Sequence, residues 1–173
     1  MKMMNFLGLI MKFKFVLGLL LSISLSACST GKGMSVSSCE QLASRLLNDF
    51  NQKDQLERVK DRTVKGLFFQ NEQPYSEAVI YRSRKEGSAN LIAIIRSKEK
   101  KKVKQDLKDY LVELKRQMVH SYPSEVFKIS NAILAESDEY VVLVIYDNIE
   151  LANQKVNNYL SQLYKGKNER NNK

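Results

Sequence analysis

Two uninterrupted apolar runs, residues 91–95 (LIAII) and 141–145 (VVLVI), constrain the fold of this chain more than any other feature. An apolar run without alternating polar residues is typical of a strand that is buried on both faces. Each run is preceded by another strand candidate, at residues 77–83 and 131–135, and by a turn. The sequence therefore predicts two strand pairs whose second members form the centre of one sheet.

Helical periodicity follows each apolar run. The first helical face consists of Val103, Leu107, Tyr110, Leu111, Leu114 and Met118. The second consists of Ile149, Ala152, Val156, Tyr159, Leu160 and Leu163, with Asp147 and Glu150 as an expected N-cap pair. An earlier helix is predicted by Cys39, Leu42, Ala43, Leu46, Leu47 and Phe50, with Ser37 and Glu40 as a capping box. Residues 52–62 are highly charged and are predicted to be either a helical extension or a loop.

The expected fold class is α+β, with an antiparallel sheet of about four strands covered by two amphipathic helices and an N-terminal helix packed nearby. The two strand–helix segments align 49 positions apart, so that Ile92 corresponds to Val141 and Val103 to Ala152. This match has two interpretations. It is either an internal repeat of a ββα unit or the same packing solution reached twice.

The N-terminal segment has the features of a secretory signal. Lys12 and Lys14 precede an apolar run, residues 15–25, which is shorter than the roughly 20 residues that span a membrane. Leu25-Ser26-Ala27-Cys28 follows this run and is typical of a bacterial lipoprotein cleavage and acylation site. The alternative is an ordinary signal peptide in which Cys28 is incidental. Met11 is an alternative start of the chain.

The lipoprotein interpretation divides the chain into four parts. Residues 1–27 are the signal peptide, 28–36 the lipidated Cys28 and a flexible tether, 37–165 a single domain, and 166–173 a disordered tail. If Cys28 carries lipid, Cys39 has no cysteine partner and no internal disulfide forms. If Cys28 carries no lipid, a bridge between these two cysteines becomes an option in an oxidising compartment.

The charge distribution points to an anionic partner outside the cytoplasm. The formal net charge is +9, but an exported, lipid-tethered chain without a recognition motif is not expected to bind nucleic acid. Anionic lipid head groups or wall polymers are the expected partners. The candidate anion contacts crowd the end of the first apolar strand and the first turns of the helix after it, and they are Arg96, Lys98, Lys100, Lys101, Lys102 and Lys104. Exposed cations at a helix N-terminus oppose the helix dipole by ~0.3–1 kcal/mol each.

No catalytic residue, metal or cofactor is predicted. His120 is the only histidine, it has no Cys or His at metal-binding spacing, and it lies where a helix C-terminus is expected. Cys39 lies on an apolar helical stripe, which does not favour a catalytic thiol. A glycine-rich phosphate loop is absent from the sequence.

The stretch from about residue 77 to 160 resembles a known family. The resemblance rests on SANLIAI (88–94) with the long helix after it, YPSE (122–125), and YVVLVI (140–145) with Asp147-Asn148. The family comprises small lipoproteins, mainly from Gram-positive bacteria, and is catalogued as domain of unknown function four-three-five-eight. Its members often have a glycine in the turn before the equivalent of Tyr140, where this chain has Ser137-Asp138-Glu139. The resemblance implies the architecture and the lipid anchor, but no activity.

The function predicted from the sequence is that of a lipoprotein anchored on the outer face of the cytoplasmic membrane. It would act there as a non-enzymatic binding or accessory module of the cell envelope. One alternative is an enzyme, or the partner of an enzyme, that acts on cell-wall polymers. Another is a structural subunit that pairs through Cys39 or through an exposed strand edge.

Overall fold

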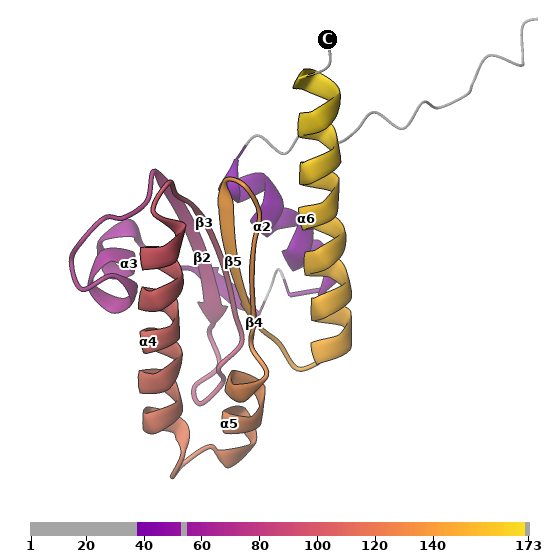
Figure 1. Cartoon of the computed structure of the whole chain (residues 1–173). Coiled ribbons are helices and arrows are strands. Elements are labelled where there is room, and N and C mark those ends of the chain that lie inside the picture. The colour runs from indigo at the N-terminus through magenta and orange to yellow at the C-terminus, as the bar shows by residue number, and fades with distance from the viewer. Residues whose placement is uncertain (1–37, 53–54, 172–173) are drawn as a thin grey trace, which may run out of the picture. The chain divides into compact units, whose positions relative to one another are not determined.

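The computed structural model describes residues 38–52 and 55–171 (Figure 1). They form a five-stranded antiparallel sheet in the order β1-β2-β3-β5-β4. The strands are β1 (Leu56–Arg58), β2 (Glu77–Ser83), β3 (Leu91–Arg96), β4 (Ile133–Glu136) and β5 (Tyr140–Ile145). The two apolar runs are the central strands β3 and β5, which pair with Ala93 opposite Leu143. The predicted α+β class and the central position of both runs are confirmed.

Five helices are described, namely α2 (Cys39–Asp49), α3 (Asp61–Phe68), α4 (Lys100–Met118), α5 (Pro123–Ser130) and α6 (Ile149–Asn171). The three helices expected from periodicity are α2, α4 and α6. The helix α6 continues to Asn171, past residue 165, where the sequence ended the domain and placed a disordered tail. This part of α6 contains no proline, and its one glycine, Gly166, costs a helix only about 1 kcal/mol.

The helices cover both faces of the sheet (Figure 1). On one face, α2 and α6 pack against Val79, Ile92, Ile94, Val142 and Val144. On the other face, α3, α4 and α5 pack against Ile80, Leu91, Ala93, Ile95, Val141, Leu143 and Ile145. Because successive strand residues point to opposite faces, a strand covered on both sides has no solvated position. This explains why β3 and β5 are apolar at every residue.

The positions of α4 and α6 show how the two segments with the repeated pattern are arranged in space. A twofold axis that exchanged the antiparallel strands β3 and β5 would be perpendicular to the sheet and would leave both helices on one face. Here α4 and α6 lie on opposite faces, so the two ββα segments are not related by such an axis. The offset nevertheless aligns Ala93 with Val142, because each of these residues faces the helix that follows its own strand. The two segments therefore share a pattern of helix-facing residues without being related by this twofold axis.

The strand β1 is the main addition to the predicted fold. It lies within residues 52–62, which the sequence assigned to a helical extension or a loop, and it pairs only with β2, with Leu56 opposite Ser83. A three-residue edge strand with one buried side chain, Leu56, carries no detectable alternation. Short, charged edge strands also limit unwanted pairing between sheets.

The sheet has two ends that matter for function. At the Arg96 end, β3 finishes and α2 begins, because the Cys39 backbone N–H donates to Glu77 Oε1 at 2.8 Å and Glu77 pairs with Arg96 at 3.1 Å. At the Lys128 end, β3 begins at Leu91 and α5 approaches the sheet. Six strand residues place the two ends roughly 17 Å apart. The residue that caps α2 is Ser38, which accepts from the Gln41 backbone N–H, whereas the expected cap Ser37 lies outside the described residues.

The predicted leader, Cys28 and the tether up to residue 36 also lie outside the described residues. None of the helices described in residues 38–52 and 55–171 is both long and apolar enough to cross a membrane.

Candidate functional site

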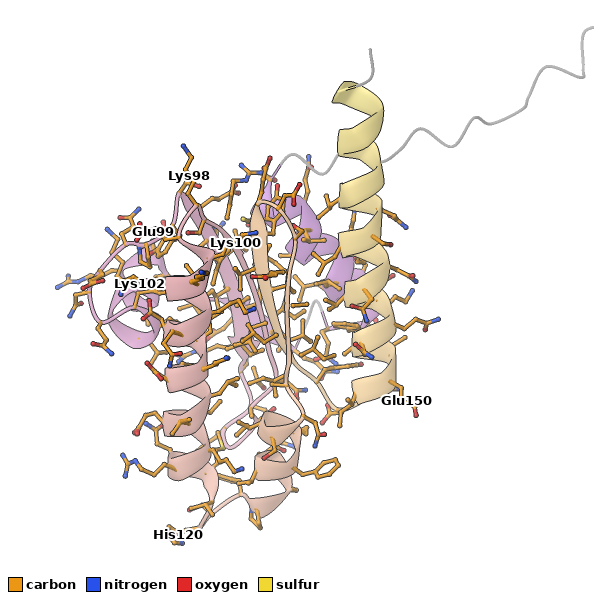
Figure 2. The ribbon with its side chains drawn as sticks, viewed as in Figure 1. Lys98, Glu99, Lys100, Lys102, His120 and Glu150 are labelled. Carbon is orange, nitrogen blue, oxygen red and sulfur yellow. The ribbon has the colours of Figure 1, made fainter. Side chains whose placement is uncertain are left out.

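The cationic cluster predicted at the start of α4 lies at the Arg96 end, and Figure 2 shows Lys98, Lys100 and Lys102 there. Four of its six members contact the rest of the domain. Arg96 pairs with Glu77 and, at 3.7 Å, with Glu139, and it also contacts the Tyr140 hydroxyl. The other contacts are Lys100 Nζ to Ser137 O at 2.8 Å, Lys102 Nζ to Glu72 Oε2 at 2.8 Å, and Lys104 Nζ to Glu136 Oε2 at 3.4 Å.

These contacts give most of the cluster a role in folding. Carboxylates from outside α4 offset the unfavourable position of Lys102 and Lys104 near the positive end of the helix dipole. Lys98 and Lys101 are exposed and make no ion pair or hydrogen bond with the residues that the structure describes. The anion contact expected from the sequence therefore narrows to these two lysines.

His120 follows α4 and is exposed at the far end of the helix from Lys100 (Figure 2). The described part of the chain contains no group of three or more His, Cys, Asp or Glu side chains that could hold a metal ion.

Cys39 is completely buried at the start of α2, and its Sγ lies 3.7 Å from the Glu77 carbonyl oxygen. Burial and, after it, the Glu77 carboxylate raise the pKa of the Cys39 thiol to about 12. The thiolate is the reactive form of cysteine, so this thiol is inert in the folded domain. Pairing of two copies through Cys39 would require the start of α2 to unfold.

A second group of polar side chains gathers at the Lys128 end around a cavity of about 630 Å³. The cavity is lined by the turn between β2 and β3 (residues 83–88), by the start of α5, and by Asn90 and Asp147, which flank the central strands. Three segments that are distant in the sequence thus meet at one end of the central strands. The volume falls within the range of about 300–1,000 Å³ that is typical of small-molecule sites.

The floor of this cavity is a hydrogen-bonded network centred on Lys128. Its Nζ lies 2.6 Å from Glu125 Oε2, 2.7 Å from Asp147 Oδ1 and 3.0 Å from Asn90 Oδ1. Asn90 Nδ2 donates to Asp147 Oδ2 at 2.8 Å, and the Ala89 backbone N–H donates to Glu125 Oε2 at 2.8 Å. The ammonium group has three donors and finds three acceptors, so the network is saturated at its centre.

The network shifts the pKa values of its charged members. Burial opposes the charged form of Lys128, whose side chain is 12% exposed, but its bonds to Asp147 and Glu125 outweigh burial and raise its pKa. Burial also acts against ionised Asp147, yet the hydrogen bonds from Lys128 and Asn90 prevail and lower its pKa. Both groups are therefore held in their charged forms around neutral pH.

An aromatic ring stands at the rim of the same cavity. Tyr122 precedes α5, is 38% exposed, and packs over Gly87 in the turn between β2 and β3. A Cβ atom at residue 87 would lie 2.2 Å from Tyr122 Cε1, and Gly87 has a φ of +73°. Glycine is required here by both the close approach of the ring and the left-handed backbone.

The sequence did not connect these residues into a site. Asn90, Glu125 and Asp147 come from the three separate segments that carry the family resemblance. Asp147 was expected to cap α6, but Asn148 Oδ1 accepts the Leu151 N–H at 2.9 Å, which leaves Asp147 for Lys128. One available signal was the placement of a polar residue directly before or close behind each apolar run.

The family model described as Domain of unknown function (DUF4358) matches residues 48–146. The match includes all five strands and every member of the Lys128 network except Asp147, which follows it directly. No match was found among curated proteins or among solved structures.

Proposed function

The chain belongs to the DUF4358 family, and on that premise we propose that it is a lipid-tethered, extracytoplasmic binding module. In this proposal, Cys28 carries the lipid at the outer face of the cytoplasmic membrane. The Lys128-end cavity is the binding site, and it opens away from the bilayer. The Leu25-Ser26-Ala27-Cys28 pattern after a short apolar run supports the anchor. Two or more acyl chains are enough for stable anchoring.

The observation that carries the proposal is the position of the two ends. The chain enters the domain at Ser38, beside the Arg96 end, and Cys28 precedes it by ten residues. Ten residues span at most ~33–36 Å when fully extended. The cavity lies at the opposite end of β3. A tether at one end and a cavity at the other suit a module that presents a ligand site to the envelope.

The chemistry of the cavity supports binding more than proton transfer. A general acid or base is most effective with a pKa near the working pH. The pKa of Asp147 is lowered by Lys128 and Asn90 against the effect of burial, and Lys128 is saturated by its acceptors. We therefore place the non-enzymatic module ahead of an enzyme that acts on cell-wall polymers.

Replacement of the anchor residue tests this function. In Cys28→Ala, we expect the protein to be released from membranes or to persist as an uncleaved precursor, because no thiol is available for lipid transfer. Detergent-phase partitioning and intact mass would be measured. Cys39→Ala is the matched control, because it removes the other cysteine and should leave partitioning unchanged. A Cys28→Ala protein of unchanged mass that still enters the detergent phase would contradict the proposal.

A further inference from the structure

The charges that line the cavity at the Lys128 end cancel. Three are cationic and three anionic, namely Arg84, Lys85, Lys128, Glu86, Glu125 and Asp147. The most buried cation, Lys128, already has three acceptors. A site for a phosphate or carboxylate needs donors in excess, as in an arginine cluster or a backbone nest. The lining therefore favours a ligand without net charge.

The same lining is rich in oriented hydrogen-bonding groups. The Asp147 carboxylate and the Asn90 amide are held in fixed planes by each other and by Lys128. A carboxylate has about four lone-pair positions, and the bonds from Lys128 and Asn90 use two of those on Asp147. The Asp147 side chain is 63% exposed, so a ligand hydroxyl can reach it. Ser88 and Ser124 add hydroxyl groups to the lining.

Tyr122 supplies an apolar surface beside these polar groups. Its ring is fixed over Gly87 and borders the cavity. A tyrosine offers a flat apolar face and a polar tip. An uncharged ligand that offers many hydroxyl groups on its edge and C–H groups on its face is a sugar ring.

We infer that the cavity binds an uncharged saccharide unit of an extracellular glycan. The assignment of that glycan to the cell envelope rests on the proposed function, whereas the chemistry of the cavity does not. The site consists of the Tyr122 ring, the Asn90–Asp147 pair and the hydroxyls of the rim, and Lys128 positions the pair without contacting the sugar.

The test uses the chain from residue 28 onward with Cys28→Ala, so that binding is measured without a lipid. Both buried clusters are composed of residues between Cys39 and Leu160. This chain therefore retains the whole described core. The probe is a preparation of Gram-positive cell walls that has been freed of protein and of anionic polymers, and the readout is the fraction of protein that sediments with it.

We expect sedimentation that persists at high salt and is competed by peptide-free glycan strands. Tyr122→Ala should weaken binding about tenfold or more, as expected when an aromatic anchor is removed. Ser124→Gln, which adds volume to the cavity from an exposed helix position, provides a second variant in case Tyr122→Ala disturbs folding. Lys108→Ala, at an exposed position of α4 outside the cavity lining, should bind like the parent chain.

Several results would overturn the inference. They are absence of binding to these walls, loss of binding at high salt, competition by the peptide fraction alone, and unchanged binding in both folded cavity variants. None of them bears on whether Cys28 is acylated, because the chain tested carries no lipid. Failure of the Cys28→Ala fractionation test would likewise leave the binding result intact.

Discussion

The two ends of the sheet carry the same group of charges in different surroundings. At the Arg96 end, one cation meets the carboxylates of Glu77 and Glu139 and the hydroxyl of Tyr140. At the other end, Lys128 meets two carboxylates and an amide. Glu77 and Tyr140 lie directly opposite Arg96 on the neighbouring strands β2 and β5, and Glu139 lies in the turn before β5, so the strand pairing itself brings them together.

The partners of Lys128 come from a helix and from the flanks of β3 and β5, and they are joined to it through their side chains. A cavity remains beside them. The position of a charge cluster in the fold, more than its composition, therefore distinguishes ion pairs with a structural role from a candidate binding site. The Arg96 cluster joins paired strands at the end of β3, whereas the Lys128 cluster is assembled from three segments and has a cavity beside it.

The largest expected effect comes from removing the central cation at each end. Lys128→Met should destabilise the domain by about 3 kcal/mol, because it leaves Glu125, whose side chain is 15% exposed, without its counter-ion. Arg96→Met should cost less, about 1–2 kcal/mol, since Arg96 and Glu77 are 29% and 30% exposed and solvent screens their interaction. Urea unfolding of both variants measures the difference. A larger loss of unfolding free energy for Arg96→Met than for Lys128→Met would contradict this ranking of the two ends.

The turn at the Lys128 end provides the next test. Gly87→Ala should cost about 1–3 kcal/mol, because φ is +73° and the added Cβ would meet the Tyr122 ring. Gly66→Ala in α3 is the matched control, since its Cβ would meet nothing closer than 3.6 Å. Alanine should stabilise that helix by roughly 0.5–1 kcal/mol. Effects of equal sign in thermal unfolding would show that Tyr122 is not fixed by Gly87.

Acid unfolding measures how strongly Asp147 and Lys128 are coupled. The folded pKa of Asp147 lies below its ordinary value, so its ionised form adds stability above about pH 4. This contribution disappears as the pH falls through the folded pKa. Asp147→Asn should therefore show a shallower loss of stability in acid than the parent protein. In a Lys128→Met background, Asp147→Asn should change the pH dependence of stability little. If Asp147→Asn had the same effect with and without Lys128, the two residues would not be coupled.

The smallest expected effect concerns the free and paired lysines at the Arg96 end. Lys101→Glu should stabilise the domain by ~0.3–0.5 kcal/mol, because an anion replaces an exposed cation near the N-terminus of α4. Lys102→Glu should give no such gain, since it removes the contacts with Glu72 and Asp106 and opposes both. Equal gains in the two variants would mean that the observed pairing of Lys102 has no energetic weight.

The sequence predicted the parts of the fold that have a strong pattern. The apolar runs identified β3 and β5, and long periodic segments identified α2, α4 and α6. The three-residue β1 was missed because Leu56 is its only buried residue. Register and sidedness were also beyond the pattern, since the opposite faces of α4 and α6 depend on how strands pair. The sequence therefore left both interpretations of the repeated pattern open.

The two candidate sites also differ in how far local sequence patterns reveal them. Lysines that crowd a short segment are conspicuous in a sequence, but their partners Glu72 and Glu136 are distant in the chain. The Lys128 network joins residues 90, 125, 128 and 147, and no local spacing links them. Only the family resemblance included three of the segments that form the network, and it implied no role for them. The assembly of these segments depends on tertiary pairing, which local patterns do not encode.

Under the proposed function, the Arg96 end faces the membrane and the Lys128 end faces away, and a pair of fluorescent labels tests this orientation directly. Cysteine would be introduced at Lys98 or at Lys85 in the acylated protein, and both positions are exposed. Cys39 is fully buried and would not react. The labelled proteins would be reconstituted in liposomes that contain a head-group quencher.

We expect strong quenching of the label in Lys98→Cys and weak quenching of the label in Lys85→Cys. Adding Cys28→Ala should abolish the quenching in both. Equal quenching of the two labels, or stronger quenching at residue 85, would contradict the proposed orientation.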